Sequence, residues 1–527
     1  MTERKCVSRR QFLHVVGLQA AAVALAACAP KAAESPTQPP AQAATSAPAA
    51  AATEAPAPTA LPAATPEPAQ AAVEIQFDAG GYTPSKYTGQ ALQEGQTEIK
   101  AFDEVANAYM ANHTNVKIKF MPNPMGNRRD AMITALTAGT APDLMWTQPD
   151  WVNEDLGKNW WLNLDPYLEM PNPYDPPDNP GSKVWHDSFY PSVDFWRAPD
   201  GHLYMLLGDQ TQVGIYYNKD IFSKAGISEE PKLWSEMIAA CEAIKKNLNM
   251  PGFAWCGGGN GELDQLTWVS GWLSKYFFWN YIKKYDENGN GWADKWEMAD
   301  AIKAGTYSAH MEEQVARLRT LKAMAAYWQD GALGVDWEPA YRLFLTGGGS
   351  MIITGVWQLN AFLNDPDRKF DLGWFYFPAV DQATWSGVPA NVPLTNVASG
   401  YGSFQYALTA TALKKGTADT CADFLMFSTT PENIGKIVDE TPQTIPNVKG
   451  APLNPLTVKM GFAESITYPP SSFQEDDSLL DYEYGQNFAS VVLPYCVGQL
   501  DEASMLDQLQ GYMNAAADRV LASRPKQ

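Results

Sequence analysis

Six residues between Asp286 and Glu297 have the types and spacing of a calcium-binding loop. They follow the EF-hand pattern D-x-N-x-N-G-x5-E, with oxygen donors expected from Asp286, Asn288, Asn290, Trp292, Asp294 and Glu297. Short Asp and Asn side chains at alternate positions point inward, Trp292 offers its backbone carbonyl and Glu297 supplies two oxygens. Because Ca²⁺ prefers about six to eight oxygens in a flexible shell, the sequence predicts a bound Ca²⁺ in this loop.

Two features distinguish this loop from that of a calcium sensor. The eighth position is Ala293, where EF-hands favour a branched apolar residue, and the sequence contains no partner loop. A turn rich in Asp, Asn and Gly that binds no metal is the alternative interpretation. Helices are expected over 268–281 and 295–304 on either side of the loop. We therefore predict a structural Ca²⁺ rather than a regulatory one.

The first 28 residues have the features of a bacterial export signal. Residues 8–13 read SRRQFL, a twin-arginine pattern, and an apolar run of small residues follows over 15–27. This run is too short to cross a hydrocarbon core of ~30 Å as a helix, so residues 1–27 are predicted to be a signal peptide. Residues 25–28 read LAAC and resemble a lipobox. Lipidation of Cys28 would anchor the protein to the outer face of the cell membrane.

The segment after Cys28 has the composition of a tether. Residues 29–72 contain 19 Ala and 10 Pro and no aromatic residue. Such a segment cannot bury a core, so 28–72 is predicted to be extended and disordered. The part of the chain after residue 72 contains all 18 Trp. It exceeds the size of one compact core, which indicates two lobes or more.

Charge and cysteine content restrict the partners and the cross-links. Without residues 1–27 the chain has 34 basic and 58 acidic residues, a net charge of −24. This field repels phosphate backbones and anionic lipids, which argues against nucleic acid as a partner. The cysteines beyond Cys28 are Cys241, Cys256, Cys421 and Cys496. Exported proteins can form disulfides, but twin-arginine export follows folding in a reducing cytoplasm, so both disulfides and buried thiols stay open.

The order of strand and helix patterns predicts an α/β fold with a mostly parallel sheet. Residues 73–77 and 116–120 alternate like strands, and helical spacing over 95–112 and 130–138 separates them from a third strand at 144–146. This rhythm is typical of a parallel sheet. The further expected elements are strands at 215–217 and 351–353 and helices at 233–248, 312–329 and 501–522.

Three segments, in this order, carry a resemblance to a known family. Residues 135–146 read ALTAGTAPDLMW, residues 201–226 contain GHLY and GIYYNKDIFSKAG, and residues 343–357 read LFLTGGGSMIITGVW. Together they resemble the family 1 extracellular solute-binding proteins of ABC sugar importers, which include the maltose-binding proteins. The likeness extends over about 73–430, and three ordered matches behind a lipoprotein signal are more specific than any one of them.

The resemblance implies a two-lobed periplasmic-binding-protein-like (type II) α/β fold with a hinge and an interlobe cleft. By analogy the chain crosses between lobes near 209–214 and 399–405. Lobe one is then 73–210 plus 402–450, and lobe two is 211–401 plus 451–527, with the loop 286–297 inside lobe two. The resemblance also implies a monomer that is not an enzyme. It would capture a di- or oligosaccharide and deliver it to the permease subunits of an ABC transporter.

The expected ligand contacts follow from this resemblance and from the chemistry of sugars. A sugar site needs flat aromatic platforms and polar groups at its rim, and open α/β sheets bind ligands at strand ends. In the family the tryptophan that corresponds to Trp357 often stacks on sugar. The other expected contacts are Trp146, Gln148, Asp150, Trp151, Asp209, Gln210, Trp255 and Tyr401. Core packing is the alternative for each tryptophan, and Asp143 is expected to support its loop rather than bind ligand.

Two other functions stay open from the sequence alone. One is a calcium-containing, surface-anchored carbohydrate-active enzyme, and the other is a calcium-dependent adhesin for glycans. The sequence has neither a G-x-S-x-G elbow nor an H-E-x-x-H motif, and paired carboxylates for glycoside hydrolysis cannot be recognised without geometry. The fold does not by itself determine which solute is bound.

Overall fold

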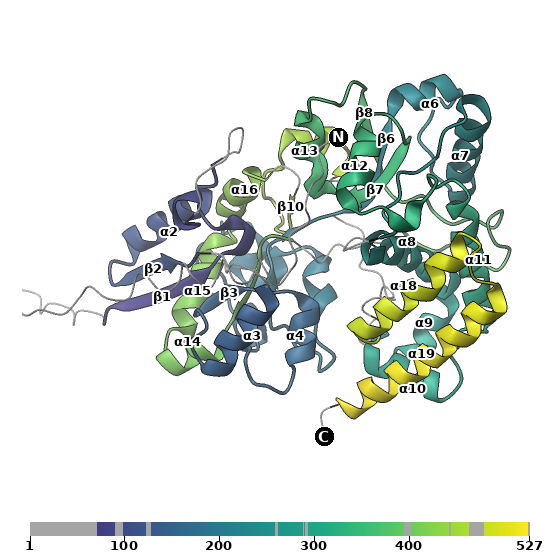
Figure 1. Ribbon diagram of the computed structural model, residues 1–527. Helices are drawn as coiled ribbons and strands as arrows, with labels where there is room; N and C mark the ends of the chain where they lie inside the picture. The colour runs from purple at the N-terminus through teal and green to yellow at the C-terminus, as the bar shows by residue number, and fades with distance from the viewer. Residues whose placement is uncertain are drawn as a thin grey trace, which may run out of the picture. The chain divides into compact units, whose positions relative to one another are not determined.

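The computed structural model describes most of the chain after residue 70, and every described residue lies in one compact unit, Ala69–Gln527 (Figure 1). The described residues are 71–89, 98–122, 128–258, 262–287, 289, 293–394, 402–441, 444–462 and 479–524. The signal peptide, Cys28 and the tether up to residue 70 lie outside them and stay predictions. Among the described helices, none is long and apolar enough to span a bilayer.

The first sheet contains five strands in the order β2-β1-β3-β9-β4. Its strands are β1 (Val73–Asp78), β2 (Val116–Phe120), β3 (Leu144–Trp146), β4 (Leu206–Leu207) and β9 (Gln405–Leu408). Strand β1 is parallel to β2 and β3, which confirms the parallel arrangement expected from the sequence. Strand β9 is antiparallel to both β3 and β4. It returns from a distant part of the chain and completes the sheet.

Helices around this sheet enclose an aromatic core. Phe77 of β1 packs edge to face against Phe102, with ring centroids 5.1 Å apart, and Tyr406 of β9 packs against Phe77 at 4.9 Å. The helices in this part of the chain are α2 (Ala101–Asn112), α3 (Arg128–Ala138), α4 (Pro149–Asp155), α5 (Asp165–Leu168), α14 (Ala410–Lys415), α15 (Ala418–Ser428) and α16 (Pro431–Asp439). The core thus combines residues from before 210 with residues from after 402.

Helix α2 begins at residue 101, later than the predicted start at 95. The reason is a long-range cap. The carboxylate of Glu440 accepts hydrogen bonds from the backbone N–H groups of Lys100 and Ala101, at 3.0 and 2.9 Å. These N–H groups have no partner within the helix itself, so a residue that follows α16 determines where α2 begins.

The second sheet has three strands in the order β7-β6-β8, with β6 (Val213–Asn218) in the centre. Strands β7 (Met351–Gly355) and β8 (Leu372–Phe375) are both antiparallel to β6, so the parallel pattern expected for later segments is wrong here. The register explains the difference. Met351 lies opposite Tyr217, so the chain re-enters the sheet at the end from which β6 left it.

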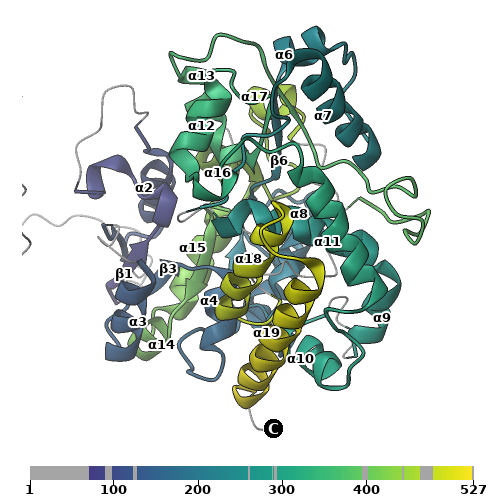
Figure 2. The same cartoon turned by 45° about the vertical axis from the view of Figure 1, so that its right-hand side comes forward.

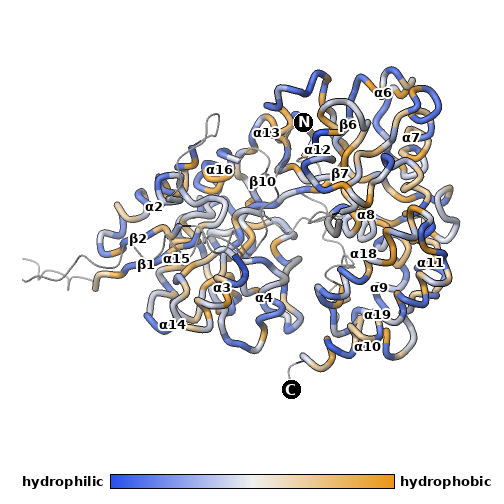
Figure 3. The backbone as a smooth tube through the Cα atoms, in the orientation of Figure 1, coloured by the Kyte–Doolittle hydropathy of each residue, from blue (hydrophilic) through white to orange (hydrophobic). Residues whose placement is uncertain are grey.

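Helices of very different lengths, from 4 to 21 residues, surround this second sheet and extend beyond it. They are α6 (Lys219–Ala225), α7 (Trp234–Leu248), α8 (Glu262–Phe277), α9 (Ile282–Tyr285), α10 (Lys295–Lys303), α11 (Glu312–Ala325), α12 (Trp337–Leu345), α13 (Leu359–Asn364), α17 (Pro455–Lys459), α18 (Tyr482–Cys496) and α19 (Glu502–Ala522). Helices α18 and α19 lie side by side in both views (Figure 2). Hydrophilic and hydrophobic residues mix along them (Figure 3), as expected of helices with one buried face.

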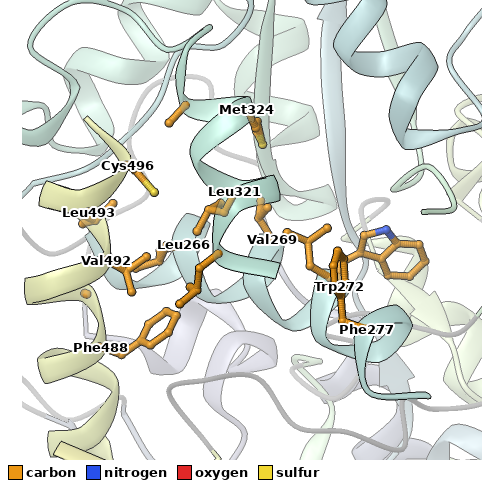
Figure 4. Close-up of a cluster of buried hydrophobic side chains, with 14 of the residues drawn as sticks. Leu266, Val269, Trp272, Phe277, Leu321, Met324, Phe488, Val492, Leu493 and Cys496 are labelled. Carbon is orange, nitrogen blue, oxygen red and sulfur yellow. The ribbon is translucent and has the colours of Figure 1, made fainter. Parts of the chain in front are cut away.

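Apolar side chains from three of these helices form the centre of a large core. Figure 4 shows Leu266 and Val269 of α8 near Leu321 of α11 and Val492 of α18. The four residues are buried. Helix α11 ends at Ala325, before the predicted residue 329, and α8 begins at residue 262 rather than 268. The predicted final helix agrees with α19 within one residue.

A buried carboxylate connects the segments at the predicted crossing. Strand β5 (Asp209–Gln210) pairs with β10 (Ile445–Pro446). One oxygen of Asp209 accepts the backbone N–H of Phe404 at 2.8 Å and the other accepts the hydroxyl of Tyr82 at 2.6 Å. Tyr82 also lies 3.0 Å from the hydroxyl of Thr444. Asp209 therefore links segments near residues 82, 404 and 444. The lobe boundaries themselves stay a prediction.

A second buried carboxylate, Asp143, holds the start of β3. It accepts hydrogen bonds from the backbone N–H of Gln76 at 2.9 Å and from the hydroxyl of Thr417 at 2.8 Å. The ammonium group of Lys415 completes the set at 3.1 Å. Asp143 has no exposed surface, and its hydrogen bonds give it the supporting role in its loop that was expected from the sequence.

We expect Asp143→Ala to lower the free energy of unfolding by roughly 2–4 kcal/mol, because buried donors lose their acceptor. Urea denaturation measures the loss. Asp371→Ala is the control, since this aspartate lies on the surface before β8. Equal stability of the two variants would contradict the supporting role of Asp143.

Asp209 predicts a specific pH dependence. Burial raises its pKa to about 6, above the value of ~3.9 for an exposed aspartate. Between about pH 4 and 6 the folded protein holds a proton that the unfolded chain releases, so this contribution to stability is present at low pH and disappears as the pH rises through 6. Asp209→Asn should flatten the dependence of the unfolding free energy on pH in this window. Asp371→Asn should leave that slope unchanged, and an unchanged slope in Asp209→Asn would refute the assignment.

Candidate functional site

Trp357 lies directly after the end of β7 and is one of the few large apolar side chains on the surface. The residue is 37% exposed. The backbone turns into a short 3-10 helix, η9 (Val356–Gln358), at Gly355. A Cβ at Gly355 would lie 1.9 Å from the indole ring, so only glycine allows the ring to fold back against the strand end. The indole ring of Trp357 thus packs against the backbone of Gly355 at the end of β7.

Three further aromatic residues back this ring. Trp268 of α8 meets Trp357 edge to face, with ring centroids 5.7 Å apart. Trp337 of α12 lies 6.0 Å from Trp268, and Tyr341 stacks on Trp337 at 5.2 Å. These three side chains are half-buried. We call the four residues the Trp357 cluster. It combines apolar ring faces with polar edges, the surface that a sugar ring needs.

Sequence reasoning missed Trp268, Trp337 and Tyr341. The spacing of Trp337 and Tyr341 places both on one helix face, but the same spacing is typical of core packing. Their position next to Trp357 depends on how α8 and α12 pack against the end of β7, and no local pattern reports that packing.

A second aromatic cluster, the Trp146 cluster, forms where β1 and β3 end. Arg128, the first residue of α3, donates to both oxygens of Asp78 at 2.7 and 2.6 Å. Its guanidinium group lies 4.6 Å from the ring centre of Trp146, and Trp151 meets Trp146 edge to face at 5.8 Å. Burial raises the pKa of Asp78, and the charge of Arg128 opposes this effect. Gly80 permits the approach, since its φ is +57° and a Cβ would clash with Trp146.

Trp146 and Trp151 were expected here, whereas Asp78 and Arg128 were not. Asp78 is the last residue of the first strand. Because ligands bind at strand ends, this position could have identified Asp78 from the sequence. Gln148 is the residue before α4 and is half-buried, and Asp150 lies within α4. Tyr401 lies outside the described residues.

Three residues that were expected to contact the ligand are fully buried in this structure. Asp209 makes the crossing contacts described above, and Gln210 beside it is equally buried. Trp255 stacks on Trp328 with ring centroids 4.0 Å apart. Its backbone exchanges two hydrogen bonds with the Gln329 amide. These side chains present no surface to a solute in this structure, because the residues packed around them enclose them.

The structure describes both ends of the predicted calcium loop. Asp286 follows α9 directly, and α10 begins at Lys295, the tenth loop position. Asp294 accepts the backbone N–H groups of Trp296 and Glu297 at 2.8 and 3.0 Å, and the Glu297 carboxylate accepts the N–H of Asp294 at 3.0 Å. Burial raises the pKa of Asp294. The remaining expected ligands, Asn288, Asn290 and Trp292, lie outside the described residues.

Within the described residues, no three His, Cys, Asp or Glu side chains are grouped to hold a metal ion. A calcium loop also uses Asn side chains and a backbone carbonyl, here from residues outside the described ones, so the bound Ca²⁺ stays a prediction. Among the same residues no disulfide is found, and the four cysteines Cys241, Cys256, Cys421 and Cys496 are buried.

Comparison with curated proteins gives partial matches. The sn-glycerol-3-phosphate-binding periplasmic protein UgpB of Agrobacterium fabrum is 29% identical over 159 residues, which cover 29% of this chain and 32% of that protein. UgpB of Brucella abortus is 29% identical over 164 residues, with 30% and 33% covered. The chain thus matches about a third of the length of these relatives.

Comparison with solved structures identifies the fold. The sugar-binding protein MalE from Xanthomonas citri superposes with a TM-score of 0.60 at 14% identity, covering 86% of this chain and all of that one. A chitin oligosaccharide binding protein gives a TM-score of 0.58 at 20% identity, covering 85% and 99%. The chain therefore has the type II periplasmic-binding-protein fold, as expected from its sequence.

A family-level match covers more of the chain. Residues 94–412, more than half of the sequence, match the bacterial extracellular solute-binding proteins. All three segments that carried the resemblance lie in this range. Sequence and fold agree, and the chain belongs to the family of bacterial extracellular solute-binding proteins, which are binding proteins rather than enzymes.

Proposed function

We propose that this protein captures a di- or oligosaccharide outside the cytoplasm and delivers it to the permease subunits of an ABC transporter. The observation that supports this most is the Trp357 cluster. A partly exposed indole at a strand end, backed by Trp268 and Trp337, is suited to stack on the C–H face of a sugar.

The charges near the Trp146 cluster favour a neutral solute over a phosphorylated one. Both oxygens of Asp78 already engage Arg128. Arg129 donates to both oxygens of Asp155 at 2.8 and 2.7 Å. A phosphate would have to compete with these carboxylates for each guanidinium group. The two curated relatives described above are named for sn-glycerol-3-phosphate, and this arrangement is our reason to propose carbohydrate instead.

The two aromatic clusters lie at the ends of strands in different sheets. We propose that they form the two faces of one site, and that the lobes close on the solute about the crossing at Asp209. A lipid on Cys28 and the tether 28–72 would keep this receptor near its permease.

We expect Trp357→Ala to weaken sugar binding about five- to thirtyfold, because a stacked ring contributes roughly 1–2 kcal/mol. Isothermal titration with maltotriose, chitotriose and raffinose measures the affinity. Trp279→Ala is the matched control, since Trp279 is a half-buried tryptophan outside both clusters. Should Trp357→Ala bind as tightly as the control, the site is misplaced. Solution scattering of the same samples should show compaction with the bound sugar.

We further propose that the loop 286–297 binds a structural Ca²⁺. The helix boundaries support this, because α9 ends just before Asp286 and α10 begins at the tenth position. Asp294 and Glu297 place carboxylate oxygens at the first turn of α10. Helix α10 also packs along α19, and Lys303 pairs with Asp518 at 2.5 Å. An ion in this loop would therefore stabilise the C-terminal helix as well.

Removal of Ca²⁺ with a chelator should lower the melting temperature by a few degrees, because an ion that binds only the folded state stabilises it by mass action. Glu297→Gln keeps an oxygen for the helix cap but loses a negative charge from the shell, and it should abolish the response. Glu287→Gln, at the second loop position, should retain it. Absence of bound calcium in metal analysis, together with an unchanged melting temperature, would overturn the proposal.

A further inference from the structure

A hollow of about 610 Å³ lies between α7, α11 and the loop around residues 381–385. Helices α7 and α11 are neighbours in both views (Figures 1 and 2). Its volume falls within the range of about 300–1,000 Å³ that is typical of small-molecule sites. None of its lining residues belongs to the Trp357 or Trp146 cluster. The proposed solute site therefore does not account for it.

An indole ring in the wall of this hollow is fixed in place. Trp385 stacks on Phe277 with ring centroids 4.7 Å apart and planes 8° from parallel. A Cβ at Gly387 would lie 2.4 Å from the same indole, so the loop also closes tightly against it. Trp385 is half-buried and lines the hollow. Trp234 also lines it but is only 1% exposed, so Trp385 supplies the accessible indole. The aromatic surface is thus formed before any ligand arrives, which lowers the entropic penalty of binding.

The polar groups of the hollow are also held in position. The hydroxyls of Ser235 and Thr384 donate to the two oxygens of Asp381, each at 2.6 Å. Each hydroxyl oxygen keeps lone pairs that can accept a hydrogen bond. Arg319 at the rim is engaged by both oxygens of Glu502, at 2.8 and 2.6 Å. The hollow therefore has oriented polar groups, and its one guanidinium group is already matched by a carboxylate.

We propose that this hollow, the Trp385 pocket, is a second carbohydrate site that takes a neutral sugar unit. The flat indole ring of Trp385 suits the apolar face of a sugar, and fixed hydroxyls suit its hydroxyl groups. The matched charge at Arg319 disfavours an anion. This second site rests on the proposed function only in one respect, which is that its ligand is a carbohydrate.

The test uses protein labelled with 5-fluorotryptophan, and fluorine NMR follows the Trp385 and Trp357 signals separately during titration with maltotriose, chitotriose and raffinose. Trp385→Phe and Trp357→Phe assign the two signals. We expect a saturable shift of the Trp385 signal that persists in Trp357→Ala. Ala323→Arg should weaken this shift about tenfold or more, because Ala323 lines the pocket and is exposed. Ala326→Arg, at the exposed end of the same helix, is the matched control.

Each outcome separates the two proposals. A sugar that shifts only the Trp357 signal overturns the second site and leaves the proposed function intact. A Trp385 shift that is equal in Ala323→Arg and Ala326→Arg overturns the assignment to this pocket. A shift of Trp385 alone supports the second site and contradicts the proposed main site. If none of the three sugars shifts either signal, both proposals fail.

Discussion

The buried carboxylate of Asp209 joins parts of the chain that are far apart in sequence. Its oxygens accept hydrogen bonds from Tyr82 and Phe404, and Tyr82 in turn contacts Thr444. Gly402 must be small, because a Cβ there would lie 2.1 Å from the same carboxylate. Removing a charged group from water is unfavourable unless hydrogen bonds compensate for it. The conformation at the crossing is therefore the one that brings the Tyr82 hydroxyl and the Phe404 N–H within hydrogen-bonding distance of Asp209.

The two aromatic clusters depend on similar constraints at the ends of their strands. Asp143 ties the start of β3 to Gln76 and Thr417, and β3 ends at Trp146. In the second sheet, β7 is paired with β6 up to Gly355, and Trp357 follows two residues later. Both rings extend from strands whose positions are fixed by buried hydrogen bonds. Rigid support of this kind allows an aromatic side chain to stay partly exposed without collapsing into the core.

Local sequence patterns predicted the helices and strands better than they predicted which side chains contact one another. Alternation identified β1 and β2, since a strand with one buried face must alternate. The start of α2 was wrong, because its cap is Glu440, more than three hundred positions away. The antiparallel second sheet was also missed, since strand direction depends on the path of the helices between the strands. Trp255 was expected at the ligand and lies against Trp328, because a tryptophan has the same pattern in a core and in a site.

The sequence by itself determined the strands and helices with strong periodicity, the family, the fold class and the calcium-loop pattern. Each of these is encoded in short segments whose residue types and spacing act locally. Only the tertiary structure decided which aromatic rings stay accessible, which carboxylates are buried and which arginines are already paired. Trp357 and Trp255 differ in exposure because of neighbours such as Trp268 and Trp328, which come from other helices or lie far along the chain. Exposure is a property of packing between distant segments, and no local pattern contains it.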